Sequence, residues 1–167
     1  QLQKLGVTVR LNCELSAEMV VQGQPGAVII STGSEAIIPP IPGIKGKNVV
    51  LAQDVLLGKE EIGQKIAVIG GGLVGAETAD FLACHQKQVC LVEMMGEIMR
   101  DGEPAPKAML LKRLAVNGVE VYTSTKVMTI EEHAVLGEQK GQPIRLDNLD
   151  NVIIAIGMRS DRKLEQT

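Results

Sequence analysis

Residues 65–93 read KIAVIGGGLVGAETADFLACHQKQVCLVE, and this stretch decides the fold. A largely apolar run at residues 65–69 leads through three consecutive glycines into a segment of helical periodicity from Gly72 to about His85. A second apolar run follows at residues 88–93. Two strands joined by a helix lie parallel in one sheet, so the sequence predicts a βαβ unit. We expect Val74, Thr78, Phe81 and Leu82 to form the helix face that packs on the sheet, and Glu77 and Asp80 to lie on another face.

The turn Gly70-Gly71-Gly72-Leu73-Val74-Gly75 has the spacing of a dinucleotide-binding loop. Gly70 permits the tight turn, and Gly72 lets backbone N–H groups approach a pyrophosphate without a Cβ between them. Gly75 lets the helix pack closely on the strand, and the helix N-terminus adds partial positive charge. We therefore predict that Gly70, Gly72, Leu73, Val74 and Gly75 bind the cofactor.

Glu93 indicates which dinucleotide is bound. It ends the second strand about 20 residues after the glycines, where a carboxylate accepts hydrogen bonds from the adenosine ribose hydroxyls. The same carboxylate repels a 2′-phosphate, and no Arg or Lys follows until Arg100. The sequence therefore favours NAD(H) over NADP(H). The alternative is that Glu93 is a solvated carboxylate at the strand end, and Glu77 either faces the nicotinamide or is solvated.

Composition narrows the function classes. The chain has 167 residues, of which 45% are apolar, and a net charge of -3, so we expect no nucleic-acid binding. The apolar runs are far shorter than the roughly 20 residues that cross a bilayer, so we expect no membrane association. The three cysteines show no paired spacing and no signal segment is visible, which fits a cytoplasmic protein with Cys84 and Cys90 as core residues. The sequence shows no Ser/His/Asp set and no metal-ligand cluster, and we expect no catalytic role for His85 or His133.

The rest of the chain adds strands and helices around the βαβ unit. The predicted elements are a helix end at 1–5, strands at 7–11, 27–30 and 48–52, a proline-rich linker at 39–43, a helical turn at 54–57, a helix at 104–117, a strand at 119–122, antiparallel hairpins within 126–146, and a strand at 151–156 closed by Gly157. The chain opens inside an element without Met, which indicates part of a longer polypeptide.

These motifs resemble a known superfamily. Residues 66–93, read with Gly33, Pro42-Gly43 and residues 155–160, resemble the pyridine-nucleotide domain of two-dinucleotide-fold flavoproteins. Within that superfamily, GGGLVGAETA and IGMRS are most similar to NADH:flavin oxidoreductases of the old yellow enzyme and 2,4-dienoyl-CoA reductase type. The resemblance implies an upstream TIM barrel with FMN and an iron–sulfur cluster, and a C-terminal half that binds FAD and NAD(P)H. Neither the barrel nor the FAD fingerprint lies in this sequence.

The resemblance implies an α/β fold in three parts. Residues 1–42 would be a trailing part of the FAD-binding domain, residues 43–155 a Rossmann-like NAD(H)-binding domain with a parallel sheet and an antiparallel β-meander, and residues 156–167 the return segment, with Gly157 at the cofactor. The expected partners are the dinucleotide and the remainder of the polypeptide, namely its FAD domain and FMN barrel. By itself the chain would be inactive. The alternatives are a disulfide reductase with an upstream cysteine pair, and a stand-alone NADH-sensing module.

Overall fold

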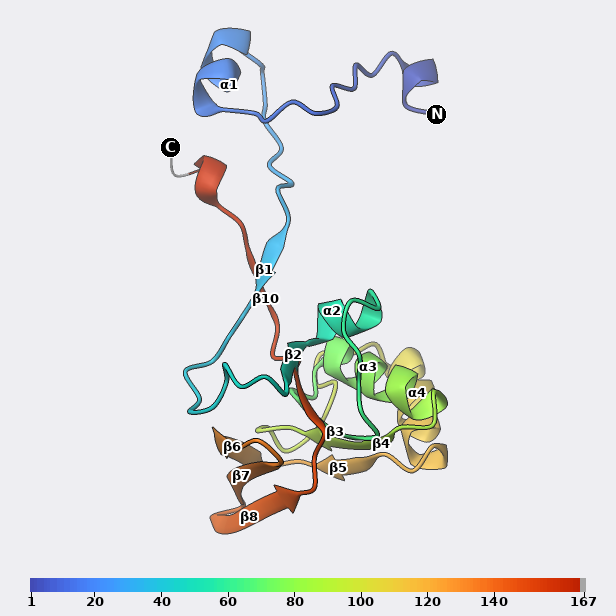
Figure 1. The fold of residues 1–167 in the computed structure, drawn as a ribbon. Coiled ribbons are helices and arrows are strands. Elements are labelled where there is room, and N and C mark those ends of the chain that lie inside the picture. The colour runs from blue at the N-terminus through green and yellow to red at the C-terminus, as the bar shows by residue number, and fades with distance from the viewer. Residues whose placement is uncertain (166–167) are drawn as a thin grey trace. The chain divides into compact units, whose positions relative to one another are not determined.

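The computed structural model describes residues 1–165 and divides the chain into two compact units. One unit is Ala36–Arg159, and the other combines Gln1–Glu35 with the residues from Ser160 onward. Ala36–Arg159 contains a five-stranded parallel sheet and a three-stranded antiparallel sheet (Figure 1). The predicted α/β class, with a parallel sheet and an antiparallel meander, is confirmed.

The parallel sheet places the glycine turn near its centre. Its strand order is β2 (Val49–Leu51), β9 (Asn151–Ile154), β3 (Lys65–Ile69), β4 (Gln88–Val92) and β5 (Glu120–Tyr122). β3 pairs with β4 on one side and with β9 on the other, as predicted for a βαβ unit. Both faces of β3 are covered, which explains why its sequence is almost continuously apolar.

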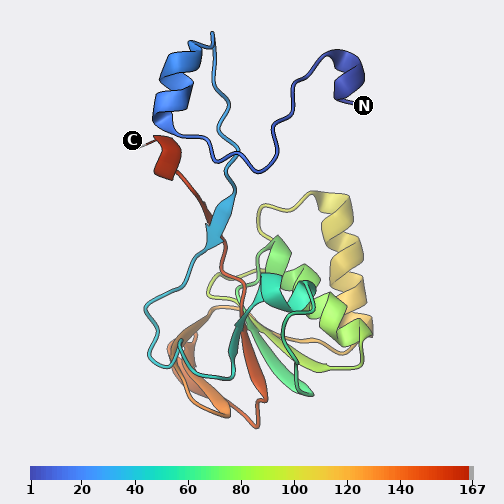
Figure 2. The ribbon, with the colours of Figure 1, turned by 45° about the horizontal axis from the view of Figure 1, so that its top comes forward.

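Three helices cover one face of this sheet, namely α2 (Ala52–Leu56), α3 (Leu73–Cys84) and α4 (Pro104–Val116) (Figure 2). The buried face of α3 differs from the prediction, because Val74 and Phe81 are 47% and 39% exposed. Gly75, Ala76 and Ala79 are buried instead, since small side chains let the helix lie close to the sheet. Asp80, expected on another face of the helix, is buried and forms an ion pair with Arg113 of α4 at 2.8 Å.

An antiparallel meander covers the opposite face. Its strands are β6 (Thr125–Ile130), β7 (Ala134–Gln139) and β8 (Gln142–Asp147). Val127, Ile130 and Val135 pack on the parallel sheet in a second apolar core. Gly137 lies inside β7. A Cβ there would come within 2.5 Å of the Lys126 carbonyl oxygen, so glycine lets the two strands approach closely.

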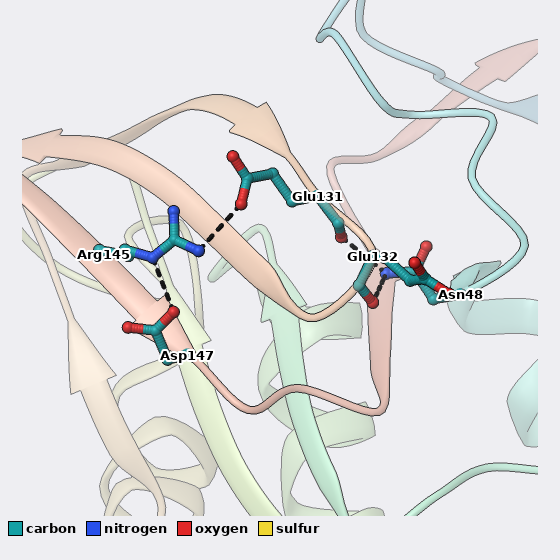
Figure 3. Close-up of polar contacts among 5 residues, drawn as sticks. All are labelled: Asn48, Glu131, Glu132, Arg145 and Asp147. Atoms are coloured by element: carbon teal, nitrogen blue, oxygen red, sulfur yellow. Dashed lines mark hydrogen bonds and ion pairs between the residues drawn. The ribbon is translucent and has the colours of Figure 1, made fainter.

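The meander is fastened to the chain that enters β2. The Asn48 side chain donates from Nδ2 to the carbonyl oxygens of Glu131 and Glu132, at 3.0 and 2.9 Å (Figure 3). Arg145 on β8 adds ion pairs to Glu131 at 2.9 Å and to Asp147 at 2.7 Å. The β6–β7 turn is therefore held at both its backbone and its side chains.

The second unit is built mainly from extended chain. It contains η1 (Gln3–Leu5), α1 (Ala17–Gly23) and η2 (Lys163–Glu165). The strands predicted at residues 7–11 and 27–30 were wrong, because these exposed residues form no ladder with a neighbouring strand within the described chain. Helix α1 was not predicted. Its signal is Ser16, whose hydroxyl accepts a hydrogen bond from the Met19 N–H at 3.3 Å and caps the helix.

Two short strands join segments from opposite ends of the chain. β1 (Ser34–Ala36) and β10 (Met158–Ser160) form a two-stranded sheet. Next to it, the Ile37 N–H donates to the Gly157 carbonyl oxygen at 3.0 Å. Within residues 1–165, no helix has the length and apolar character that crossing a bilayer requires.

Candidate functional site

A cleft of about 920 Å³ opens at the carboxyl edge of the parallel sheet. It is lined by the ends of β3 and β4, by residues 155–157 after β9 and by the first turn of α3. Residues 39–42 and 125–128 complete its walls. In open α/β sheets, ligands bind at this edge, in the crevice between neighbouring strands.

The cleft brings together six of the seven predicted cofactor-binding residues. These are Gly70, Gly72, Leu73, Val74, Glu93 and Gly157. The seventh, Gly75, is buried behind the turn and does not line the cleft. A Cβ at Gly75 would collide with the Gly70 carbonyl oxygen, so this glycine lets α3 begin directly after the turn.

Gly72 lies at the mouth of the cleft as the N-cap of α3. Its backbone, with φ of -65° and ψ of -175°, is one that any residue adopts. A Cβ built there would meet no atom within 4 Å. Neither backbone strain nor protein packing therefore requires glycine at this position. The open space in front of the first N–H groups of α3 fits the pyrophosphate of a dinucleotide.

The Glu93 carboxylate is held in place by two backbone amides. Gly71 N–H donates to Oε2 and Met95 N–H donates to Oε1, each at 2.6 Å. Gly71 is also required for close approach, because its Cβ would lie 2.8 Å from the Cβ of Glu93. A carboxylate has about four lone-pair sites, so two remain for ribose hydroxyls. The arrangement fits an adenosine ribose.

A second pocket, of about 340 Å³, lies next to Glu93 and contains a residue that sequence reasoning had set aside. Arg100 lines this pocket together with Glu93 and Met95. The chain returns here because the Met99 N–H donates to the Gly71 carbonyl oxygen at 2.7 Å. Sequence spacing placed Arg100 beyond the strand end and gave no signal for this return.

Residues 39–42 and 125–128 also escaped the sequence analysis as parts of the site. The first segment was interpreted as a linker, but the Ile130 N–H of β6 donates to the Pro42 carbonyl oxygen at 2.9 Å. Gly43, with φ of +86°, is packed so closely that a Cβ would collide with the Ile130 carbonyl oxygen. The proline-rich segment is thus attached to the meander, and the two segments form one wall.

The remaining polar candidates lie outside the cleft. Glu77 is exposed on α3, and the two histidines contact backbone carbonyl oxygens, His85 that of Phe81 at 2.7 Å and His133 that of Leu149 at 3.1 Å. No group of three or more His, Cys, Asp or Glu side chains within the described residues could hold a metal ion.

The cysteines differ in exposure. Cys90 is buried, and burial raises the pKa of its thiol to about 11, so it is protonated at neutral pH. Cys84, expected in the core, is exposed and is the last residue of α3. Its sulfur accepts a hydrogen bond from Asn117 Nδ2 at 3.3 Å.

The chain has relatives among known oxidoreductases. Bilirubin reductase of Mediterraneibacter gnavus (strain CC55_001C) is 37% identical over 159 residues, which cover 95% of this chain and 25% of that protein. The structure of a 2-naphthoyl-CoA reductase in complex with 2-naphthoyl-CoA is 28% identical, with a TM-score of 0.85 over 99% of this chain and 25% of the other. A NAD-dependent persulfide reductase from A. fulgidus is 27% identical, with a TM-score of 0.64 over 81% of this chain and 26% of the other.

These matches cover only part of each relative, whereas the family profile covers most of this chain. The chain spans about a quarter of the length of the first three curated relatives, at 25%, 24% and 25%. The sequence profile of the pyridine nucleotide-disulphide oxidoreductase family, in contrast, matches residues 16–167, which is most of the chain. By this match, the chain belongs to the pyridine nucleotide-disulphide oxidoreductase family, whose members use FAD and NAD(P)H.

Proposed function

We propose that the cleft binds NADH and that Ala36–Arg159 orients it for hydride transfer to a flavin bound elsewhere in the whole protein. The observation that carries this proposal is Gly72, where the chain keeps a glycine that neither its backbone nor its packing requires. The N–H groups at the start of α3 would take the diphosphate, and Glu93 would accept the ribose hydroxyls. When bound, NADH supplies the hydride and the flavin accepts it.

Apolar residues next to the glycine turn and the backbone after β9 would position the nicotinamide. Leu73 and Val74 are about half exposed, although they are apolar and lie in the first turn of α3. Gly157 lies after β9 at the same edge, with φ of +122°. These groups offer an apolar surface and a close backbone approach, which suit a flat ring better than a charged group.

Within the family, we assign the chain to the NADH:flavin oxidoreductase type. Support comes from the extent of the structural similarity, because the 2-naphthoyl-CoA reductase aligns over 99% of this chain and the persulfide reductase over 81%. In this proposal, residues 1–42 and 156–167 belong to a FAD-binding domain and residues 43–155 to the NAD(H)-binding domain. The rest of the polypeptide is then the partner of the second unit.

Two other functions make different demands. A disulfide reductase needs a redox-active cysteine pair in the whole protein, and its activity would disappear when that pair is replaced. An NADH-sensing module would bind NADH without oxidising it. Steady-state oxidation of NADH by the flavin-loaded whole protein, with only a candidate redox-active cysteine pair replaced by serine, separates the three: the proposal expects oxidation to persist.

The test of NADH binding uses Gly72→Ala. Alanine fits the open space and the backbone and loses only the preference for glycine at an N-cap, so its free energy of unfolding should fall by no more than about 1 kcal/mol. NADH affinity, measured by isothermal titration calorimetry, should fall about tenfold or more because the methyl group occupies the phosphate position. Gly26→Ala is the matched control, since it also meets open space but lies in the other unit. Unchanged affinity in Gly72→Ala, or no NADH binding by the wild type, would contradict the proposal.

A further inference from the structure

The meander contributes a positive charge to the cleft. Among the described residues that line the cleft, only Glu93 and Lys126 carry an ionisable side chain. The Glu93 carboxylate already accepts two backbone hydrogen bonds. Lys126 lies on β6 and is exposed. The cleft therefore has one anion held by the protein and one cation at its wall.

The position of Lys126 follows from how β6 is attached to the sheet. The Thr125 N–H donates to the Glu93 carbonyl oxygen at 2.9 Å, so β6 begins directly at the end of β4. Lys126 is the next residue, and β6 is an edge strand of the meander, in the order β6-β7-β8. Lys126 and Gly72 therefore line the same cleft from different elements, the meander and the helix N-terminus.

The Lys126 ammonium has no anionic partner among the described residues. Glu138 is its register partner across the β6–β7 pair, but no hydrogen bond or ion pair joins the two side chains. Elsewhere in Ala36–Arg159, several lysines are engaged: Lys59 pairs with Asp54 at 3.2 Å and Lys107 pairs with Glu97 at 3.1 Å. A lysine at a ligand cleft without a protein partner remains available to a ligand anion.

We propose that Lys126 binds the diphosphate of the dinucleotide and is a positioning residue of the site. This inference rests on the proposed NADH binding. The α3 N-terminus offers backbone N–H groups and only a partial charge, whereas the diphosphate carries full negative charges. A flexible ammonium on the facing wall supplies the full positive charge that the glycine turn lacks. The meander thereby contributes to affinity as well as to packing.

The test measures binding of NADH, ADP and adenosine to the full chain by calorimetry. Because the pair would be solvent-exposed, Lys126→Gln should weaken NADH and ADP by about two- to fivefold. Adenosine, which has no phosphate, should bind the variant and the wild type equally. Lys126→Arg keeps the charge and should restore the affinity. The difference in NADH affinity between the wild type and Lys126→Gln should largely disappear near 1 M salt, where the screening length is about 3 Å.

The matched control is Lys112→Gln, which removes the same charge from an exposed position on α4 away from the cleft. Equal weakening by both variants would overturn the inference, because it would reflect net charge only. Unchanged NADH binding in Lys126→Gln, with binding lost in Gly72→Ala, would also overturn it and leave the proposed function intact. A wild type that binds no NADH would remove the proposed function and this inference together.

Discussion

The two walls of the cleft differ in what they offer a ligand: one offers mainly backbone groups and the other mainly side chains. The glycine wall is the turn at residues 70–75, of which residues 70 and 72–74 line the cleft. It offers backbone groups and leaves hardly any room for side chains near Gly70 and Gly75. The meander wall, residues 39–42 and 125–128, offers side chains held by strand pairing and by the contact of Pro42 with Ile130. Steric limits therefore restrict which residues the glycine wall can contain. In the meander wall, side chains can be replaced while the backbone, held by strand pairing, stays in place. In our proposal, general recognition of a dinucleotide belongs to the first wall, and adjustment of affinity belongs to the second.

The strongest way to break the glycine wall is Gly75→Ala. The added methyl would overlap the carbonyl oxygen of Gly70, a backbone atom that cannot move without shifting β3 or α3. We expect the free energy of unfolding to fall by about 3 kcal/mol, at the upper end of the range for overpacked cores. Urea denaturation followed by circular dichroism measures it.

The same change at Gly72 is the comparison for Gly75→Ala, since it meets open space and should cost no more than about 1 kcal/mol, the loss expected at an N-cap. If Gly75→Ala is as stable as the wild type, the turn is deformable and the contrast between the two walls disappears. If both alanine variants unfold easily, the glycines act through backbone conformation rather than through the space around them.

Glu93 lies where the walls meet, because its carbonyl oxygen accepts from Thr125 and its carboxylate accepts from Gly71 and Met95. In Glu93→Gln, the charge-assisted hydrogen bonds to the ribose are weakened or lost, each worth roughly 1.5 to 3 kcal/mol, so NADH should bind about ten- to a hundredfold more weakly. NADPH should bind the wild type less tightly than NADH, and the variant should narrow that ratio. Titration of both nucleotides into both proteins measures the effect.

Stability must be measured alongside, because glutamine has only one side-chain oxygen for the two amides that Glu93 binds. A ratio of NADPH to NADH affinity that stays the same in Glu93→Gln would make Glu93 a structural residue only. Equal affinity of the wild type for both nucleotides would assign the 2′-phosphate to Arg100 in the neighbouring pocket. Replacing Arg100 with Gln would then restore the preference for NADH.

A smaller effect concerns the strand that carries the glycine wall. The Asp150 carboxylate accepts the Gln64 and Lys65 N–H groups at 2.7 Å each, and these hydrogen bonds hold its pKa below the usual value of 3.8. The pKa of Asp150 is lower in the folded than in the unfolded protein. The contribution of its carboxylate to the free energy of unfolding is therefore fully present above the unfolded pKa, and it is lost as pH falls through the folded pKa. Wild type and Asp150→Asn should differ in unfolding free energy by a constant amount above about pH 5 and converge in acid.

Chemical denaturation at a series of pH values tests this expectation. Asp147→Asn is the matched control, because Asp147 is also exposed but pairs with Arg145 on the meander. A difference between wild type and Asp150→Asn that persists below the pH at which Asp150 is protonated would mean that the side chain acts through packing and not through its charge.

Local sequence patterns predicted the secondary structure correctly where residues that are close in sequence are also close in space. Residues 65–93 were predicted almost element by element, because the strand, turn and helix are contiguous and the apolar periods differ between them. The helix face was wrong at Val74 and Phe81, since close packing chose small residues over large ones. Large apolar residues are thus a poor guide to the buried face when a helix must approach a sheet closely.

The meander wall could not be predicted, because it depends on contacts between distant segments. Pro42 and Ile130 are separated in sequence by β2, β3, β4 and β5, and Thr125 and Glu93 by α4 and β5. The linker interpretation of residues 39–43 followed correctly from proline chemistry, since prolines block helices and strands. Proline-rich chain can nevertheless lie flat against a sheet edge, and no local signal distinguishes the two outcomes.

The pairing of β2 with β9 has a consequence for how Ala36–Arg159 could be moved between proteins. Strands near the two ends of this unit are parallel neighbours, with Val50 opposite Ile153, and Ile37 bonds to Gly157. Entry and exit therefore lie together, as they do in units that tolerate insertion into a host chain. Such a unit behaves as a cassette: it could be grafted into a surface turn of another scaffold, or circularly permuted by joining its ends and opening the turn at Lys140-Gly141, with every strand of the parallel sheet left uncut.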